Sequence, residues 1–166
     1  MTQPLFAQAL SVGGLFNTSL FALPRFQREY AWDSDEVEQF MDDLQAHIES
    51  PSYFLGLIIL TATDDQEDER RQIVDGQQRL LTVTLLALAL FDEAKHGGRD
   101  ALADRIEADF LHAIDYDTDD VRPRLLLTDT RDKQHMDALR AAVQESVGGE
   151  DNNSKVRALH AAAGRN

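Results

Sequence analysis

The residues from Leu80 to Phe91 are apolar on nearly every side of a helix, and no other stretch constrains the fold as strongly. A helix without a polar face has to be surrounded by other elements, so we expect it at the centre of the domain. Gly97-Gly98 marks its end. The residues Arg71 to Val74 predict a strand before it, and the β-rich run from Tyr53 to Ala62 predicts a partner strand in a hairpin.

Shorter elements are predicted around this hairpin and helix. Residues Ser19 to Leu23 indicate a strand ended by Pro24, and Gly56 indicates a bulge or a close approach of the backbone. A helix beginning near Asp33 or Ser34 has a predicted buried stripe of Val37, Phe40, Met41, Leu44 and Ile48. The expected later elements are a helix marked by Leu102, Ile106, Phe110 and Ile114, an acidic loop at Asp115–Asp120, a strand at Arg124–Thr128, and a helix marked by Met136, Leu139 and Val143.

Length and composition limit the class of protein. A chain of 166 residues is long enough for one domain with a real core, which we place at residues 1–147. Residues 148–166 read as a linker and the start of a following helical region, so the chain is expected to be a piece of a longer protein. It has no cysteine, no signal peptide and no membrane-spanning stretch, which favours the cytoplasm. A net charge of −14 opposes broad contact with nucleic acid, so an anion would have to bind in a local basic hollow.

The residues Asp75-Gly76-Gln77-Gln78-Arg79 lie between the predicted strand and the central helix. A helix N-terminus presents backbone N–H groups and a partial positive charge, to which phosphates bind. Gly76 allows close approach, Arg79 can fork onto phosphate oxygens, and Asp75 can hold a metal or polarise a water. The simpler interpretation is an ordinary Asp-Gly turn, with Asp75 as the helix N-cap and Arg79 at the surface.

The loop from Pro24 to Trp32 gathers polar and aromatic side chains. Its candidate binding residues are Arg25, Gln27, Arg28 and Tyr30, because arginine binds phosphate and both arginine and tyrosine stack on bases. Phe26 and Trp32 are better explained as anchors of the loop to the core. We expect Arg28 and Tyr30 to face the same cavity as Gln78 and Arg79, since an anion in so acidic a chain needs several converging cations.

Together these motifs resemble the N-terminal domain of GmrSD-type and SspE-type restriction enzymes. The shared pattern is a Pro-x-aromatic-Gln-Arg-x-Tyr-x-Trp loop, an acidic helix, Tyr-Phe-Leu-Gly, and then Val-Asp-Gly-Gln-Gln-Arg-Leu, here over about Leu15 to Phe91. A weaker similarity continues through Arg124 to Leu139. Leu81 stands where the family often has threonine, which is a conservative change within a helix.

The resemblance implies an α+β fold of the ParB/sulfiredoxin-like kind, with a small mixed sheet and surrounding helices. It also implies that the chain is an NTPase, with nucleotide binding and hydrolysis at the turn. Asp75, Gln77, Gln78 and Arg79 would then be catalytic, Asp75 would bind the expected Mg²⁺, and the nucleotide would contact Gly76, Arg79, Arg25, Gln27 and Arg28. Full-length relatives carry a C-terminal HNH nuclease, whereas the five histidines here show no metal-ligand spacing, so no nuclease site is expected in this chain.

A second hypothesis makes the domain a sensor of modified DNA, with phosphorothioate among the candidate modifications. The sensing residues would be Pro24, Phe26, Arg28 and Tyr30, whose apolar walls favour a less hydrated atom than phosphate oxygen. DNA binding could gate NTP turnover, so the two hypotheses are compatible. The remaining alternatives are a DNA-modification-binding module without turnover and a structural domain that supports the nuclease.

Overall fold

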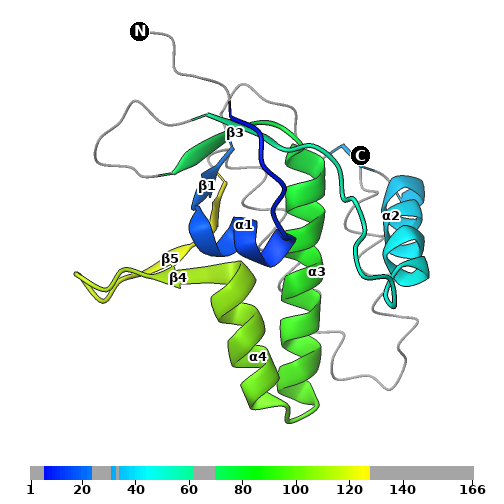
Figure 1. Ribbon diagram of the computed structural model, residues 1–166. Helices are drawn as coiled ribbons and strands as arrows, with labels where there is room; N and C mark the ends of the chain where they lie inside the picture. The colour runs from blue at the N-terminus through cyan, green and yellow to red at the C-terminus, as the bar shows by residue number, and fades with distance from the viewer. Residues whose placement is uncertain (1–5, 24–30, 33, 62–69, 128–166) are drawn as a thin grey trace, which may run out of the picture.

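A computed structural model describes residues 6–23, 31–32, 34–61 and 70–127 (Figure 1). The main sheet has four strands in the order β2-β3-β1-β6. Its central strand β1 runs parallel to β3 and β6, whereas β2 runs antiparallel to β3 at the edge. The strands are β1 (Phe21–Ala22), β2 (Ile59–Thr61), β3 (Arg71–Asp75) and β6 (Leu125–Leu126). The predicted hairpin of β2 and β3 is therefore confirmed, and so is the α+β class with its small mixed sheet.

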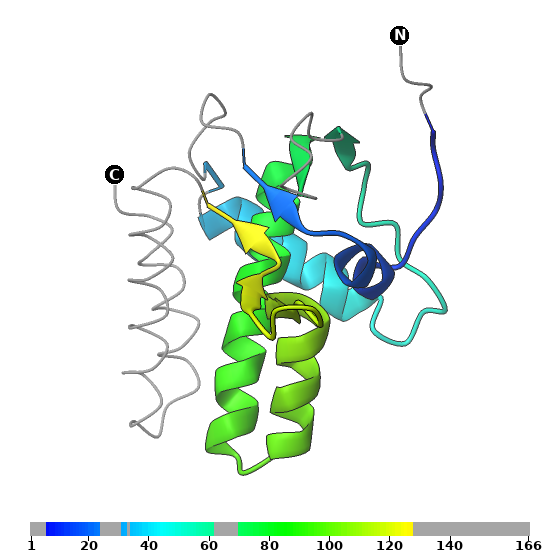
Figure 2. The same ribbon diagram turned by 90° about the vertical axis from the view of Figure 1, so that its left-hand side faces the viewer.

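The long helix α3 (Gln77–His96) lies between helix α2 (Ser34–Ala46) and the sheet (Figure 1). Helix α4 (Asp100–Ile106) continues into a π-helical turn, η1 (Glu107–Leu111), and runs beside α3 (Figure 2). The remaining described elements are α1 (Val12–Thr18) and a separate two-stranded sheet of β4 (His112–Ile114) and β5 (Val121–Pro123). The sequence patterns had not predicted α1, β4 or β5.

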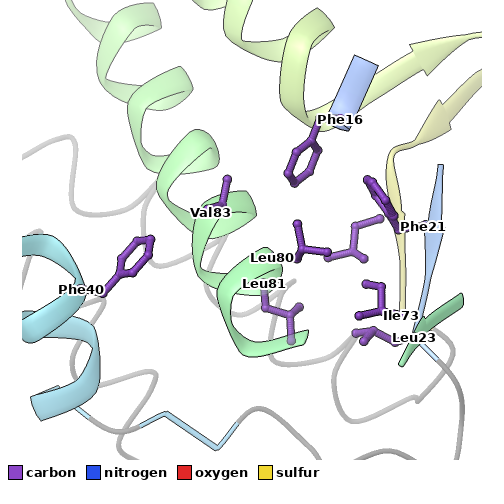
Figure 3. Close-up of a cluster of buried hydrophobic side chains, with 9 residues drawn as sticks. Phe16, Phe21, Leu23, Phe40, Ile73, Leu80, Leu81 and Val83 are labelled. Carbon is purple, nitrogen blue, oxygen red and sulfur yellow. The ribbon is translucent and has the colours of Figure 1, made fainter. Parts of the chain in front are cut away.

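The central position predicted for the apolar helix is confirmed in its first turns. All residues from Leu80 to Thr84 are buried, whereas Leu90 is 50% exposed further along. Figure 3 shows Leu80 and Leu81 directed towards side chains of the sheet, with Phe40 of α2 on the other side of α3. The most completely buried large side chains are Phe16, Phe21, Ile73 and Leu80. Burying each of them contributes about 1.5–3 kcal/mol to folding, so the core fixes the β3–α3 junction on which the candidate site stands.

Two predicted helical stripes extended too far. Phe40 is buried and Leu44 packs against the core, but Met41 and Ile48 are 40% and 81% exposed, and α2 ends before Ile48. Ile114 lies in strand β4 instead of a helix, because the helical segment ends at Leu111. A side chain from outside that helix binds a carbonyl near its end: Nε and Nη2 of Arg124 donate to the Ala108 carbonyl at 3.1 and 2.6 Å.

The predicted strand from Tyr53 to Ala62 is the third element that differs. Among the described residues of this stretch, regular β-structure covers Ile59–Thr61, and residues 53–58 belong to no regular element. The reason is a contact with the start of α3, since this segment crosses the turn at Gly76 and Arg79. The helix and linker predicted beyond Thr128 lie outside the described residues.

Candidate functional site

The turn between β3 and α3 is built around Gly76. This residue is the N-cap of α3 and has φ +85°, a left-handed conformation that glycine adopts without strain. A Cβ at this position would collide with the Ile58 side chain and lie 3.0 Å from the Leu57 carbonyl oxygen. The simple N-cap interpretation of Asp75 is wrong, because its Oδ1 accepts a hydrogen bond from the Gly76 N–H at 2.8 Å, ahead of the helix.

Gly56 confirms the predicted close approach, and the group that approaches it is the Arg79 side chain. Gly56 has φ +120°, and a Cβ on it would lie 2.9 Å from Nε and 3.0 Å from Cζ of Arg79. The guanidinium of Arg79 therefore lies against the backbone of the segment that crosses the turn. A side chain at position 56 would displace this guanidinium. Gly56 and Arg79, which are separated by most of the hairpin, therefore pack together as parts of one site.

Arg79 is half-buried, and its guanidinium makes no hydrogen bond or ion pair in the part of the chain that the structure describes. That is unusual in a chain of net charge −14. The first turn of α3 also contains no acidic residue. The positive end of the helix and the arginine charge therefore act together on the space in front of the turn.

Arg70, Arg71 and Arg79 are close in sequence but do not form one basic cluster in the fold. Arg70 is 8% exposed, and its Nη1 donates to the Pro123 carbonyl at 2.9 Å, so it ties the strands together. Arg71 stands at the opposite end of β3 from Asp75. Of these three cations, only Arg79 lies at the turn, and the spacing of arginines in the sequence could not show which of them bind backbone carbonyls.

Gln78 connects the turn to the loop that precedes α2. Its Oε1 accepts a hydrogen bond from the Ala31 N–H at 2.9 Å, although the residues are 47 positions apart. Trp32 packs against the core, with its ring centroid 5.6 Å from that of Phe40, as expected of an anchor. The contact places the end of the loop beside Gln78. The loop candidates themselves lie outside the described residues: Pro24, Arg25, Phe26, Gln27, Arg28 and Tyr30.

A group of side chains next to this turn was not predicted from the sequence. The Tyr53 hydroxyl donates to Oδ2 of Asp43 at 3.3 Å, and the Tyr53 ring lies 4.7 Å from the His47 ring between centroids. Burial and the Asp43 carboxylate raise the pKa of Tyr53 above its usual value, while the charge of Arg79 acts in the opposite direction. Tyr53 lies on the same segment as Gly56, whose backbone contacts Arg79, and so belongs to the surroundings of that arginine. The available signal was its position three residues before Gly56 in the Tyr-Phe-Leu-Gly motif.

No group of three or more histidine and acidic side chains that could hold a metal ion occurs among the described residues. Asp75 offers one carboxylate at the turn, and one of its oxygens is already bonded to the Gly76 N–H. Mg²⁺ at phosphate sites commonly takes one or two protein carboxylates and completes its shell with phosphates and waters. Asp75 fits that restricted role and no larger one.

The fold and the site define an α+β domain with a glycine-capped helix N-terminus and a half-buried arginine in front of it. The sequence matches the family model described as GmrSD restriction endonuclease, N-terminal domain, over residues 12–159. Because this match covers most of the chain, the protein belongs to that family and is a component of a restriction system. None of the curated proteins compared with it matches. None of the described helices is long and apolar enough to cross a membrane.

Proposed function

We propose that this domain binds and hydrolyses a nucleoside triphosphate at the turn from Asp75 to Arg79, as the regulatory part of a restriction system directed at modified foreign DNA. The observation that supports this most is Arg79, a half-buried cation without a partner among the described residues, held against Gly56 at a helix N-terminus. Keeping such a charge away from water is costly unless an anion compensates it. A phosphate bound at the turn supplies that compensation.

Each residue of the turn has a role in the proposed reaction. Arg79 and the first turn of α3 would hold phosphate oxygens and stabilise the charge that develops on them. Gln77 or Gln78 would orient the attacking water, since phosphoryl transfer depends on positioning and electrostatics. Asp75 would polarise that water or supply a carboxylate to Mg²⁺ when the metal is present with the phosphates. Gly76 gives the turn its left-handed conformation and leaves room for the crossing segment at Leu57 and Ile58.

Phosphate release with each of the common nucleoside triphosphates tests this proposal. The wild-type protein should release phosphate from at least one of them, and Arg79→Ala should not. Arg99→Ala is the matched control, because Arg99 is an exposed arginine just after the C-terminus of the same helix. No turnover by wild type with any nucleotide would contradict NTP hydrolysis in this domain, and equal turnover by wild type, Arg79→Ala and Arg99→Ala would contradict the role of Arg79.

A second candidate function is recognition of the DNA modification by the loop from Pro24 to Trp32. The Gln78–Ala31 hydrogen bond supports it, because it joins this loop to the turn and would let an occupied loop alter the geometry of Gln78. Arg28 and Tyr30 would contact the altered backbone group, with Pro24 and Phe26 as apolar walls. Duplexes that differ only in one modification, phosphorothioate first, test it. Tyr30→Ala should remove any preference for the modified duplex.

The proposed partners follow from these two roles. They are a nucleoside triphosphate, modified DNA and a C-terminal HNH nuclease domain in the full-length protein, whose cleavage the nucleotide site would regulate. If turnover is absent while modified DNA still binds preferentially, the domain is a binding module without its own reaction. If neither activity is found, the motif residues serve the fold or the nuclease interface.

A further inference from the structure

Tyr53 is under the influence of both an acid and the arginine of the candidate site. Its hydroxyl donates to Asp43 Oδ2 at 3.3 Å, while Gly56, three residues later on the same segment, touches the Arg79 guanidinium. Burial and the Asp43 carboxylate raise the pKa of the phenol and the charge of Arg79 lowers it, in keeping with these two contacts. Asp43 is thus a carboxylate whose hydrogen-bond partner, Tyr53, belongs to the surroundings of Arg79.

A carboxylate near an anion site weakens anion binding if it pairs with the arginine of that site. An arginine that forms an ion pair has to give up that partner before it can bind phosphate, so the acid competes with the ligand. Asp43 does not pair with Arg79; its carboxylate accepts the Tyr53 hydroxyl instead. The Tyr53 ring also lies against His47, with an interplanar angle of 31°, and His47 Nδ1 lies 2.8 Å from the Asp43 carbonyl oxygen. These contacts hold the phenol where it can engage Asp43.

We propose that Tyr53 is a positioning residue that holds the Asp43 carboxylate away from Arg79 and so keeps the guanidinium available to an anion. This inference rests on the proposed function, because it presumes that Arg79 binds phosphate. It assigns a role to Tyr53, Asp43 and His47, which lie outside the Asp75–Arg79 turn. Tyr53 acts through Asp43 and does not itself need to touch the ligand.

Calorimetric titration with sodium pyrophosphate tests the inference with a probe that has neither base nor DNA. Tyr53→Phe keeps the ring and its contact with His47 but removes the hydroxyl, so Asp43 becomes free to pair with Arg79. Affinity should fall roughly three- to fivefold, the size expected of a partly exposed ion pair. Adding Asp43→Asn should restore wild-type affinity or better. Tyr116→Phe is the matched control and should change nothing, because Tyr116 is 95% exposed on the β4–β5 hairpin.

The rescue separates positioning from direct contact. If Tyr53→Phe with Asp43→Asn binds as weakly as Tyr53→Phe alone, the hydroxyl contacts the ligand itself and the inference is overturned. Unchanged affinity in Tyr53→Phe overturns it as well. Asp43→Asn alone, which keeps the phenol, should bind at least as tightly as wild type; weaker binding would mean that Asp43 supports the site instead of competing with it.

A second measurement without ligand distinguishes failure of this inference from failure of the proposed function. The Nε–H resonance of Arg79 should shift in Tyr53→Phe and return in the double variant, because Asp43 reaches the guanidinium only in the single variant. A shift that returns, in a wild-type protein that does not bind pyrophosphate, refutes the anion site and keeps the role of Tyr53. An Arg79 resonance that is the same in wild type and Tyr53→Phe overturns the role of Tyr53 whatever the titrations show.

Discussion

Arg124 and Arg79 are both withdrawn from water, yet their surroundings differ completely. Arg124 is 9% exposed and donates to the carbonyls of Phe16 and Ala108 and to Oδ1 of Asn17. It thereby joins α1, η1 and β6. Arg79 is half-buried and donates to none of the described residues. One arginine thus has partners that belong to the fold, whereas the other has none among the described residues.

The two arginines also differ in how their positive charge is compensated. Burial lowers the pKa of the Arg124 guanidinium, while the charge of Asp109 acts in the opposite direction. Carbonyl dipoles then compensate the buried charge at fixed positions, which favours a single arrangement of the chain. Arg79 has no such carbonyl partners in the part of the chain that the structure describes, so an anion bound there would add contacts of this kind. Mutations should therefore affect stability at the first arginine and binding at the second.

The largest effect is expected from Arg124→Ala. It would leave the buried Phe16 carbonyl and the partly buried Ala108 carbonyl without these donors and open a gap among three elements, so we expect a loss of about 3–5 kcal/mol in the free energy of unfolding. Urea denaturation followed by circular dichroism measures it. Arg124→Lys should recover only part of the loss, since an ammonium cannot reproduce the fork of the guanidinium. A loss below about 1 kcal/mol would show that the contacts of Arg124 do not hold these elements together.

Arg79→Ala should give the opposite result. Removing a charged phosphate contact should weaken nucleotide binding by about 1.5–3 kcal/mol, which is roughly ten- to 150-fold, with little change in the unfolding midpoint. Isothermal titration and urea denaturation of the same preparation measure both quantities. Unchanged affinity in a folded Arg79→Ala protein would contradict the assignment of Arg79 to binding and Arg124 to stability.

Gly56→Ala probes the surface on which Arg79 rests. The new methyl group would push against the guanidinium and would occupy a φ of +120°, which residues other than glycine rarely adopt. We expect a stability loss of about 1–3 kcal/mol together with weaker nucleotide binding. Gly98→Ala is a suitable control for the backbone effect, because Gly98 has φ +66° with nothing within 4 Å of its added Cβ. If both variants bind nucleotide equally well, the contact between Gly56 and Arg79 has no part in the site.

The part of this site formed by local sequence was predictable. The junction of β3, the glycine turn and α3 follows from a strand pattern, a glycine and an apolar helix that are adjacent along the chain. Gly56 was recognisable as a point of close approach because a glycine inside a β-rich run often marks a bulge or a neighbouring group that needs the space. What approached it could not be known, because a contact between Gly56 and Arg79 depends on how the hairpin folds back.

Long-range partners of polar side chains were not predictable in the same way. Nothing in the spacing of Arg70 or Arg124 shows that their guanidinium groups end on backbone carbonyls of other segments. The closeness of Arg70 and Arg79 in sequence is therefore no guide to which cations lie at the turn. Tyr53 and Asp43 were missed for a related reason, since they come from a loop and a helix that meet only in the folded chain. The roles of the loop residues from Pro24 to Tyr30 stay predictions.

Asp75→Ala should have a smaller effect on stability and a selective effect on turnover. The substitution removes the acceptor of the Gly76 N–H, which contributes about 1 kcal/mol to folding. If Asp75 polarises water or holds Mg²⁺, hydrolysis should fall much further than nucleotide affinity. Steady-state turnover and titration, each with and without magnesium, measure the two. Hydrolysis at the wild-type rate would exclude Asp75 from the reaction.

The smallest effect concerns plain DNA, and it follows from how the described cations are used. Arg70 and Arg124 bind carbonyls, and a further group is paired with acids: Lys95, Arg105 and Arg122. Among the described residues, few positive charges are therefore left to neutralise phosphates. Binding to unmodified duplex should be weak, with a slope of log affinity against log salt on the order of two or three.

A modification read by the loop should raise affinity without changing that slope, because contact with a less hydrated atom releases no further counterions. Titrations of matched modified and plain duplexes over a salt series measure both quantities for wild type and for Tyr30→Ala. Arg79→Ala should lower the slope by no more than about one, since it removes a single phosphate contact. A steep slope that survives Arg79→Ala would mean that DNA is held by cations elsewhere, and the role of Arg79 would then be confined to the nucleotide.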